Sequence, residues 1–346
     1  MATRLTVPPK VLAAAEAGDS KALEAWLHGL RHHRVAGVDE VGVGNIAGPL
    51  VAVAVVLYPP AAKGEWPQAC RPGDQFDLTG VRDSKVMSAA ARAAVMARLP
   101  PPTDVVMSAP VLLTRMAHWA LLADPIGGVV QPDIELRSAD LGGEIARRAG
   151  GPAAGVEYAI GVAPPAVVDH LGPKIALAAA RATAVRALPS GLPEAMLVDG
   201  ELPRGKTMIE VPAGIAAVAY VPRGDRLAGA VSVASIIARE TRDELMAEAE
   251  SCWPGYGFGD TGGHPGVAHL AALAARGPCP IHRRSCKPVK KVLAEKGEPC
   301  AEEKKGNRDS DAGKKQGKGG SVARGKRGRF EGELSARKRE GGNAAA

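Results

Sequence analysis

Five short apolar runs mark the candidate strands of this chain. They occupy residues 35–40, 50–58, 156–163, 195–198 and 215–221. The run LVAVAVVLY at 50–58 is continuously apolar and rich in β-branched residues, which is typical of a strand buried on both faces. A Gly-rich stretch at 41–49 joins it to the run before it. This pattern predicts a hairpin with a long, Gly-rich loop.

Apolar positions that recur every three or four residues predict helices between and after these strands. The predicted helices are residues 11–33, 88–99, 111–122, 165–188, 231–250 and 266–276. The second of them begins at Ser88, a residue type that suits the N-cap position. In 231–250, Val233, Ile237, Thr241 and Leu245 fall on one line at four-residue spacing, which is the apolar face of a helix.

The end of the chain differs in composition from the rest. After residue 290 it is rich in Lys, Gly and Ser, and we expect 291–346 to be a basic disordered tail because it has too few apolar residues to bury. Residues 301–346 hold 13 Lys or Arg and 7 Asp or Glu, so most of the formal net charge of +7 belongs to this tail. The tail fits a nuclear-targeting patch, a non-specific nucleic-acid tether or a solubilising segment, and its composition does not separate the three.

The cysteines and the apolar runs bear on where the protein works. Five cysteines are scattered along the chain, and their odd number argues against a disulfide framework. No apolar stretch approaches the ~20 residues that span a bilayer, and 1–10 lacks the basic and apolar regions of a signal peptide. We therefore expect a reduced cytoplasmic protein without a membrane partner.

Carboxylates end three of the predicted strands, as Asp39-Glu40, Asp199 and Asp225. Functional groups gather at strand ends in open α/β sheets, so these four acids would meet if the strands were neighbours. Carboxylates at close range repel unless a cation lies between them, and hard oxygen ligands suit Mg²⁺ or Mn²⁺. Asp39 and Glu40 would point to opposite faces of a regular strand. Both could therefore serve one site only if the chain leaves that geometry, with Gly42 and Gly44 supplying the freedom. Taken singly, each acid also fits a solvated turn.

A second metal hypothesis comes from the cysteines. Cys279, His282 and Cys286 have a spacing that could suit zinc, with Cys252 as a fourth ligand. The set lacks the paired Cys-x-x-Cys of a zinc knuckle, which disfavours it.

Several motifs together resemble the ribonuclease HII family. The opening one is Gly37-Val38-Asp39-Glu40 with a Gly-rich loop and Ala47-Gly48-Pro49. The others follow in the family's order: Asp83-Ser84-Lys85, Ile160 to Ala163, Leu197 to Gly200, Gly224-Asp225, Ala234 to Ile236 with Thr241 to Asp243, Pro254 to Phe258, and Pro280 to Ser285. No single block is specific, but the ordered set from 35 to 289 is.

The resemblance implies a ribonuclease H-like fold, an α/β mixed five-stranded sheet flanked by helices with a helical C-terminal extension. The domain would run from 34 to 290, with 1–33 as an N-terminal helical extension and 100–155 as an insertion, because that stretch is longer than in the family. It implies a monomeric endonuclease that cuts the RNA strand of RNA/DNA hybrids and cuts 5′ to single ribonucleotides in duplex DNA, leaving 5′-phosphate and 3′-hydroxyl ends.

The resemblance also assigns roles to residues. Asp39, Glu40, Asp199 and Asp225 would be the catalytic acids that hold two Mn²⁺ or Mg²⁺ ions. Backbone groups of Gly42, Val43 and Gly44 would meet the ribose 2′-hydroxyl, which distinguishes RNA from DNA. Apart from the resemblance, the basic side chains of Lys85, Arg283 and Arg284 suit contacts to phosphates, which position a duplex without reading its sequence. Arg242-Asp243 instead suits a structural ion pair on a helix.

The chain departs from the family pattern at positions in or near the motifs that would contact the substrate. Val43 stands in place of the loop's Arg, His264 in place of a Tyr that stacks on the sugar, Gly266 in place of a Thr and Arg239 in place of a Lys. These changes leave two interpretations: an active nuclease with altered junction preference, or a weakened enzyme that mainly binds hybrids. A junction resolvase on the same fold is disfavoured by the ordered motifs.

Overall fold

A seven-stranded mixed sheet forms the centre of the computed structural model, which describes residues 2–58, 75–101, 146–153, 155–201 and 211–297. The strands run in the order β1 (Thr3–Arg4), β7 (Ala217–Val221), β6 (Ala195–Asp199), β2 (Val35–Val41), β3 (Leu50–Leu57), β5 (Val156–Ala163) and β4 (Ala146–Ala153). The first four are parallel to one another, and β2, β3, β5 and β4 pair antiparallel.

The predicted α/β fold class is confirmed, and the five predicted strands form the middle of the sheet. The sheet has two edge strands in addition to the five that were predicted. β1 comes from the segment expected to be only helical, and β4 comes from the expected insertion. The hairpin of β2 and β3 is present as predicted, with Val41 paired to Val51 across the loop.

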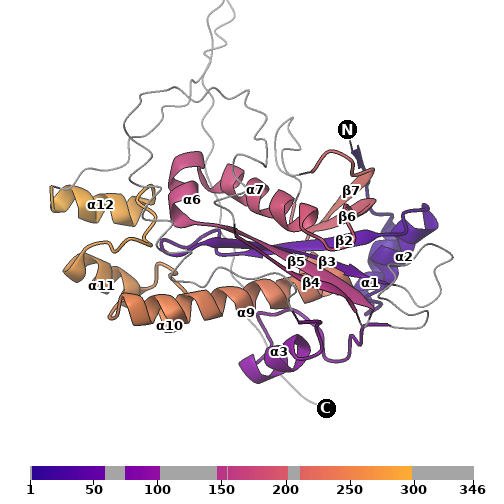
Figure 1. Cartoon of the computed structure of the whole chain (residues 1–346), viewed down its shortest axis with the longest axis horizontal. Helices are drawn as coiled ribbons and strands as arrows, with labels where there is room; N and C mark the ends of the chain where they lie inside the picture. The colour runs from indigo at the N-terminus through magenta and orange to yellow at the C-terminus, as the bar shows by residue number, and fades with distance from the viewer. Residues whose placement is uncertain (1, 59–74, 102–145, 154, 202–210, 298–346) are drawn as a thin grey trace, which may run out of the picture. The chain divides into compact units, whose positions relative to one another are not determined.

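Helices cover both faces of the sheet (Figure 1). The long α9 (Gly229–Cys252) packs on β2 and β3 from one side, and α7 (Pro173–Arg186) packs on β3 and β5 from the other. Because successive side chains of β3 point to opposite faces, Val53 and Val55 join the core with α9 while Ala54 and Val56 join the core with α7. The prediction that this strand is buried on both faces is therefore confirmed.

Close approach of α9 to β2 depends on Gly37. A Cβ at this position would lie 2.4 Å from the backbone carbon of Ala230 and the backbone nitrogen of Val231. Only glycine allows this approach. It brings the start of α9 directly against the strand that carries Asp39.

Two of the predicted helices are each broken in two. The one expected at 11–33 is α1 (Pro9–Glu16) followed by α2 (Ala22–Gly29), because Gly18 between them has a φ of 104°. The one expected at 165–188 is α6 (Pro165–Leu171) followed by α7, because Gly172 has a φ of 78° and Pro173 cannot continue a helix. The helix predicted at 111–122 lies outside the described residues.

The other predicted helices are confirmed, and the C-terminal part is helical as expected. Ser88 caps α3 (Ala89–Met96) by accepting a hydrogen bond from the Ala91 N–H at 3.2 Å. The C-terminal helices are α10 (Phe258–Thr261), α11 (Val267–Arg276) and α12 (Lys287–Glu295). The domain boundary predicted at residue 290 falls inside α12, whose Val292 and Leu293 are buried. No helix among the described residues has the length and apolar character needed to cross a membrane.

Candidate active site

The carboxyl ends of three parallel strands bring the predicted acids to one edge of the sheet. β2 pairs with β6 through Val38 and Val198, and β6 pairs with β7 through Asp199 and Val221. Asp225 follows β7 in the short helix α8 (Gly224–Leu227), and its backbone N–H donates to Oδ1 of Asp199 at 3.4 Å. The three strands are thus neighbours, which is the condition that the sequence pattern set for these acids to lie at one edge of the sheet.

Charge repulsion couples these carboxylates. Burial, together with the charges of Glu40 and Asp199, raises the pKa of Asp39 to about 8, while a hydrogen bond from Ser235 opposes the shift. Burial also raises the pKa of Asp199, and the charge of Asp225 adds to the effect. The interactions therefore link all four acids in the order Glu40, Asp39, Asp199, Asp225.

Asp39 and Glu40 belong to opposite faces of β2. The ladder to β3 is regular here, with Asp39 opposite Val53 and Glu40 opposite Ala52, so the expected departure from strand geometry does not occur. Asp39 is buried and interacts with Ser235 on α9. Glu40 instead accepts hydrogen bonds from Arg181 on α7, with Nη2 at 2.6 Å and Nε at 3.2 Å. No sequence signal pointed to Arg181.

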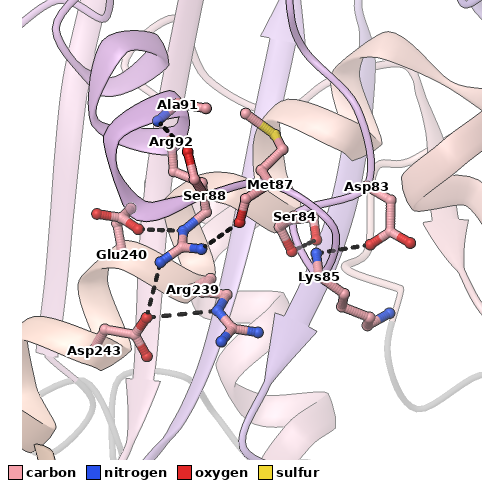
Figure 2. A network of polar contacts seen from close by, with 11 residues as sticks. Asp83, Ser84, Lys85, Met87, Ser88, Ala91, Arg92, Arg239, Glu240 and Asp243 are labelled. Carbon is pink, nitrogen blue, oxygen red and sulfur yellow. Dashed lines mark hydrogen bonds and ion pairs between the residues drawn. The ribbon is translucent and has the colours of Figure 1, made fainter. Parts of the chain in front are cut away.

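Lys85 enters the site from the segment before α3. Its Nζ lies 2.9 Å from Oδ2 of Asp225, and the Lys85 side chain is 65% exposed. The segment is held by Asp83, whose Oδ1 accepts from the Lys85 N–H at 2.8 Å and whose Oδ2 lies 2.8 Å from Nη2 of Arg226. Ser84 Oγ lies 2.9 Å from Ser235 Oγ, which ties the segment to α9 beside Asp39 (Figure 2).

A second set of polar contacts fixes α3 on α9. Figure 2 shows Arg92 of α3 reaching Glu240 and Asp243 of α9, and its Nη1 donates to the Met87 carbonyl at 3.0 Å. Arg239 also contacts Asp243, at 3.5 Å. Asp243 therefore pairs with Arg92 and Arg239, and the predicted ion pair with Arg242 is wrong.

Two buried arginines hold the Gly-rich loop from behind. Arg242 donates to the carbonyls of Pro49, Ala47 and Gly262 at 3.1, 3.0 and 2.6 Å. Arg283 donates to the carbonyls of Gly48 and Val43 at 2.9 and 3.2 Å. Only 1% of Arg283 is exposed, so the structure gives it a loop-holding role in place of the predicted phosphate contact.

Burial lowers the pKa values of both arginines. Burial and the charge of Arg283 lower the pKa of Arg242 to about 9, and burial lowers the pKa of Arg283 to about 10. Both guanidinium groups remain charged at neutral pH. Because hydrogen bonds from charged donors are stronger than those from neutral ones, the two arginines hold the loop carbonyls firmly.

The predicted loop glycines differ in their surroundings. Gly42 has a φ of 91°, and a Cβ there would lie 2.5 Å from Nε of Arg242. Gly44 has open space around the position of a Cβ. Val43 between them is 43% exposed. Gly42 is thus required by the packing of Arg242, whereas the space at Gly44 is open to a ligand.

His264 lies on a turn that packs against this loop. The backbone N–H groups of Ile46 and Ala47 donate to the Gly263 carbonyl at 3.0 and 3.3 Å, and the Asn45 side chain donates to the Gly262 carbonyl at 2.6 Å. His264 itself is exposed. The structure therefore places His264 beside the loop, although the two are more than 200 residues apart in sequence.

The cysteines do not support the zinc hypothesis. Sγ of Cys279 lies 3.2 Å from Nδ1 of His282, but Nδ1 also accepts the Cys279 N–H at 3.0 Å, and Sγ of Cys286 contacts the Asn45 carbonyl at 4.0 Å. Cys252 is exposed. Among the residues described, no three His, Cys, Asp or Glu side chains are placed to hold a metal ion, the four carboxylates included.

Comparison with known proteins identifies the family. The model of the family "Ribonuclease HII" matches residues 36–118 and 156–289, and the chain belongs to this family. The ribonuclease HII of Nitrosococcus oceani is 33% identical over 260 residues, 75% of this chain and 92% of that protein. That of Salinispora arenicola is 33% identical over 297 residues, 85% of this chain and 82% of that protein. The crystal structure of ribonuclease H2 from Pyrococcus horikoshii matches with 19% identity and a TM-score of 0.44, over 76% of this chain and 98% of that one.

Membership in this family establishes the general activity of the protein. The protein is a ribonuclease H of type HII, a hydrolase that acts on nucleic acid as an endoribonuclease.

Proposed function

We propose that this enzyme cuts the RNA strand of RNA/DNA hybrids and cuts 5′ to single ribonucleotides in duplex DNA, leaving 5′-phosphate and 3′-hydroxyl ends. The observation that carries the proposal is the row of coupled carboxylates, Asp39, Glu40, Asp199 and Asp225, at the carboxyl ends of three strands. Phosphodiester hydrolysis develops negative charge that needs concentrated positive charge beside it.

The chemistry of the four donors, rather than their placement among the described residues, suits divalent metal ions. Four carboxylates supply hard oxygen ligands of the kind that Mg²⁺ and Mn²⁺ take, and burial together with the charges of Glu40 and Asp199 raises the pKa of Asp39. Asp39, Glu40, Asp199 and Asp225 would hold two Mn²⁺ or Mg²⁺ ions. Bound ions of this kind supply an activated water and stabilise the leaving oxygen.

Three groups of residues would contact the substrate. Lys85 reaches Asp225 with an exposed side chain and would contact a phosphate beside it. The backbone at Gly42, Val43 and Gly44 would contact the ribose 2′-hydroxyl. His264, exposed on the adjacent turn, would stack on the sugar in place of the family's Tyr.

The test is a cleavage assay with two labelled substrates, a DNA duplex that holds one ribonucleotide and a continuous RNA/DNA hybrid. Each is incubated with wild type, Asp39→Asn, Asp199→Asn and the exposed control Asp19→Asn, in Mn²⁺, in Mg²⁺ and with EDTA. We expect wild type and Asp19→Asn to cut 5′ to the ribonucleotide with either metal, and the two site variants to lose about 10³-fold or more of the rate.

The other outcomes separate the alternatives. Cleavage of the continuous hybrid alone would mean that Val43 and His264 narrow the substrate range, and the single-ribonucleotide part of the proposal would be wrong. Binding of either duplex without cleavage in any metal would favour the weakened, hybrid-binding protein and overturn the proposal.

We further propose that the enzyme is a cytoplasmic monomer and that its basic tail adds sequence-independent affinity for nucleic acid. Deletion of residues 298–346 would then weaken duplex binding at low salt and reduce its salt dependence, because each lost phosphate contact lowers the slope. Gel filtration tests the monomer. An unchanged salt dependence after the deletion would remove the tail from the binding role.

A further inference from the structure

Two buried histidines lie in ring-to-ring contact behind the turn that carries His264. His269 of α11 is fully buried and His282 is 2% exposed, and their Nε2 atoms are 3.1 Å apart. Nδ1 of His269 lies 2.9 Å from the His264 carbonyl. Tyr256 and Phe258 enclose the pair, with ring centroids 4.9 Å from His282 and 5.4 Å from His269, respectively.

The hydrogen bonds determine which nitrogen carries each proton. Nδ1 of His282 accepts the Cys279 N–H at 3.0 Å, so the proton of the neutral His282 ring is on Nε2. That N–H donates to Nε2 of His269, which leaves the proton of His269 on Nδ1, where it donates to the His264 carbonyl. Each ring nitrogen of the two histidines then has a hydrogen-bond partner, and the donors of this series of hydrogen bonds all point from Cys279 toward His264.

Both rings are neutral at the pH of an ordinary assay. Burial and the charge of His269 lower the pKa of His282 to about 4, and burial lowers the pKa of His269. Burial raises the pKa of the Cys279 thiol to about 11, so no thiolate competes for the protons.

The pair also joins the two segments that flank the Gly-rich loop. On one side, the Gly263 carbonyl accepts the backbone N–H groups of Ile46 and Ala47. On the other side, His282 bridges Ala47, and the backbone N–H of Arg283 donates to the Ile46 carbonyl at 2.8 Å. The ring contact of His269 and His282 is therefore a side-chain link between these segments at the base of the loop.

We propose that His269 and His282 are positioning residues, which act through the His264 carbonyl to hold His264 beside the loop for the substrate. This rests on the proposed function, in which His264 contacts the ribonucleotide. The bond from His269 fixes the main chain of His264 at the start of α11, where the Gly266 N–H donates to the same carbonyl at 2.8 Å. Neither buried ring touches the substrate.

Amide replacements of His269 separate its two bonds. The amide nitrogen of Asn occupies nearly the position of histidine Nδ1, so His269→Asn keeps the donor to the His264 carbonyl and loses the contact with His282. The amide of Gln reaches the position of Nε2, so His269→Gln keeps a partner for His282 and loses the donor to His264. Both remove a buried ring, and each serves as the other's control for packing.

The experiment measures KM and kcat on the single-ribonucleotide duplex for wild type, the two His269 variants, His264→Ala and the double variant His264→Ala/His269→Gln. We expect His269→Gln to raise KM about fivefold while kcat stays within about twofold, since one hydrogen bond is lost and the acids are untouched. His269→Asn should stay closer to wild type in KM. The double variant should have the KM of His264→Ala alone, because residues that act through one another are not additive.

Equal KM increases in His269→Asn and His269→Gln, or effects that multiply in the double variant, would overturn the proposal. A readout independent of activity is the ¹⁵N spectrum of histidine-labelled wild type, which should show the Nδ1–H form for His269 and the Nε2–H form for His282. Other tautomers would also overturn it. If wild type cuts neither duplex, the proposed function fails while the spectrum still tests the histidine chain.

Discussion

Lys85 and Asp225 form one of two crossed ion pairs between the segment before α3 and helix α8. Nζ of Lys85 lies 2.9 Å from Oδ2 of Asp225, and in the reverse direction Nη2 of Arg226 lies 2.8 Å from Oδ2 of Asp83. In each pair the carboxylate is buried while more than half of the cationic side chain is exposed, so the buried acids are fixed and the cations face solvent. Lys85 can therefore meet a ligand without leaving the site.

Replacing Lys85 by Met should reduce activity far more than stability. The side chain is 65% exposed, so loss of its ion pair should change the free energy of unfolding by less than about 1 kcal/mol. KM for the duplex should rise about tenfold because a phosphate contact is lost, and Lys85→Arg should recover part of it. Urea unfolding and steady-state kinetics measure the two effects. An unchanged KM in Lys85→Met would contradict the phosphate contact.

Glu24 should make stability depend on pH between about 4.5 and 7. Burial raises its pKa from the ordinary value of 4.5 to about 7, while the Ala230 N–H at the start of α9 donates to Oε1 at 2.8 Å. The folded protein holds this proton where the unfolded chain has released it. The free energy of unfolding therefore falls as the pH rises through this window, by about 2 to 4 kcal/mol for this group, and changes no further above it.

Glu24→Gln should remove this dependence, since the amide does not ionise. Relative to wild type, the variant should be more stable at pH 8 than at pH 5, as measured by urea unfolding at both pH values. The exposed Glu16→Gln serves as the control and should behave as wild type. Parallel pH profiles of Glu24→Gln and wild type would show that Glu24 does not titrate in this range.

Alanine at the two loop glycines should have different effects. Gly42→Ala places a Cβ 2.5 Å from Arg242 in a backbone with φ of 91°, and should cost about 2 kcal/mol or more. Gly44→Ala meets nothing within 4 Å and should stay within about 0.5 kcal/mol of wild type. If the backbone at Gly44 contacts the ribose, this stable variant should still raise KM for the single-ribonucleotide duplex. Equal stability losses at the two positions would be evidence against the described loop conformation.

Arg242→Met should destabilise the protein by about 3 kcal/mol. It removes the Arg242 donor from the interior carbonyls of Ala47 and Pro49, and a buried acceptor without a partner is costly. The Gly262 carbonyl also loses Arg242 but keeps the donor from Asn45. Arg239→Met, on the same helix but 40% exposed at its side chain, is the matched control and should lose less than about 1 kcal/mol. Thermal unfolding of both variants distinguishes the two environments. Similar losses would mean that Arg242 does not hold the loop.

The acids were predictable from sequence, while their neighbours were not. Asp39, Glu40 and Asp199 lie in buried apolar strands and Asp225 follows one, so a local pattern finds them. Arg181 sits on an Ala-rich helix whose pattern gives no sign that it faces Glu40, because that contact depends on how α7 crosses the sheet. For the same reason the sequence did not show that Arg283 points inward.

The missed element boundaries left visible signals. Gly18 and Gly172-Pro173 interrupt the two helices that were predicted as continuous, and apolar periodicity alone passes over such breaks. Val292 and Leu293 continue the helical spacing of Val289 on α12, but they were assigned to a tail that was judged by its Lys content. The strand β1 has only two residues, too few for any periodic pattern to appear.

The parallel pairing of β2 with β6 sets the order in which the enzyme acquires its chemistry during translation. Val35 pairs with Ala195, so the strand that carries Asp39 and Glu40 cannot pair with β6 until residues about 160 positions later have been synthesised. A nascent chain that ends before residue 195 has two of the acids and no neighbouring carboxylate for them to meet. Because such long-range pairing forms only once both segments are available, the row of acids can assemble only after the chain has been synthesised past Asp225.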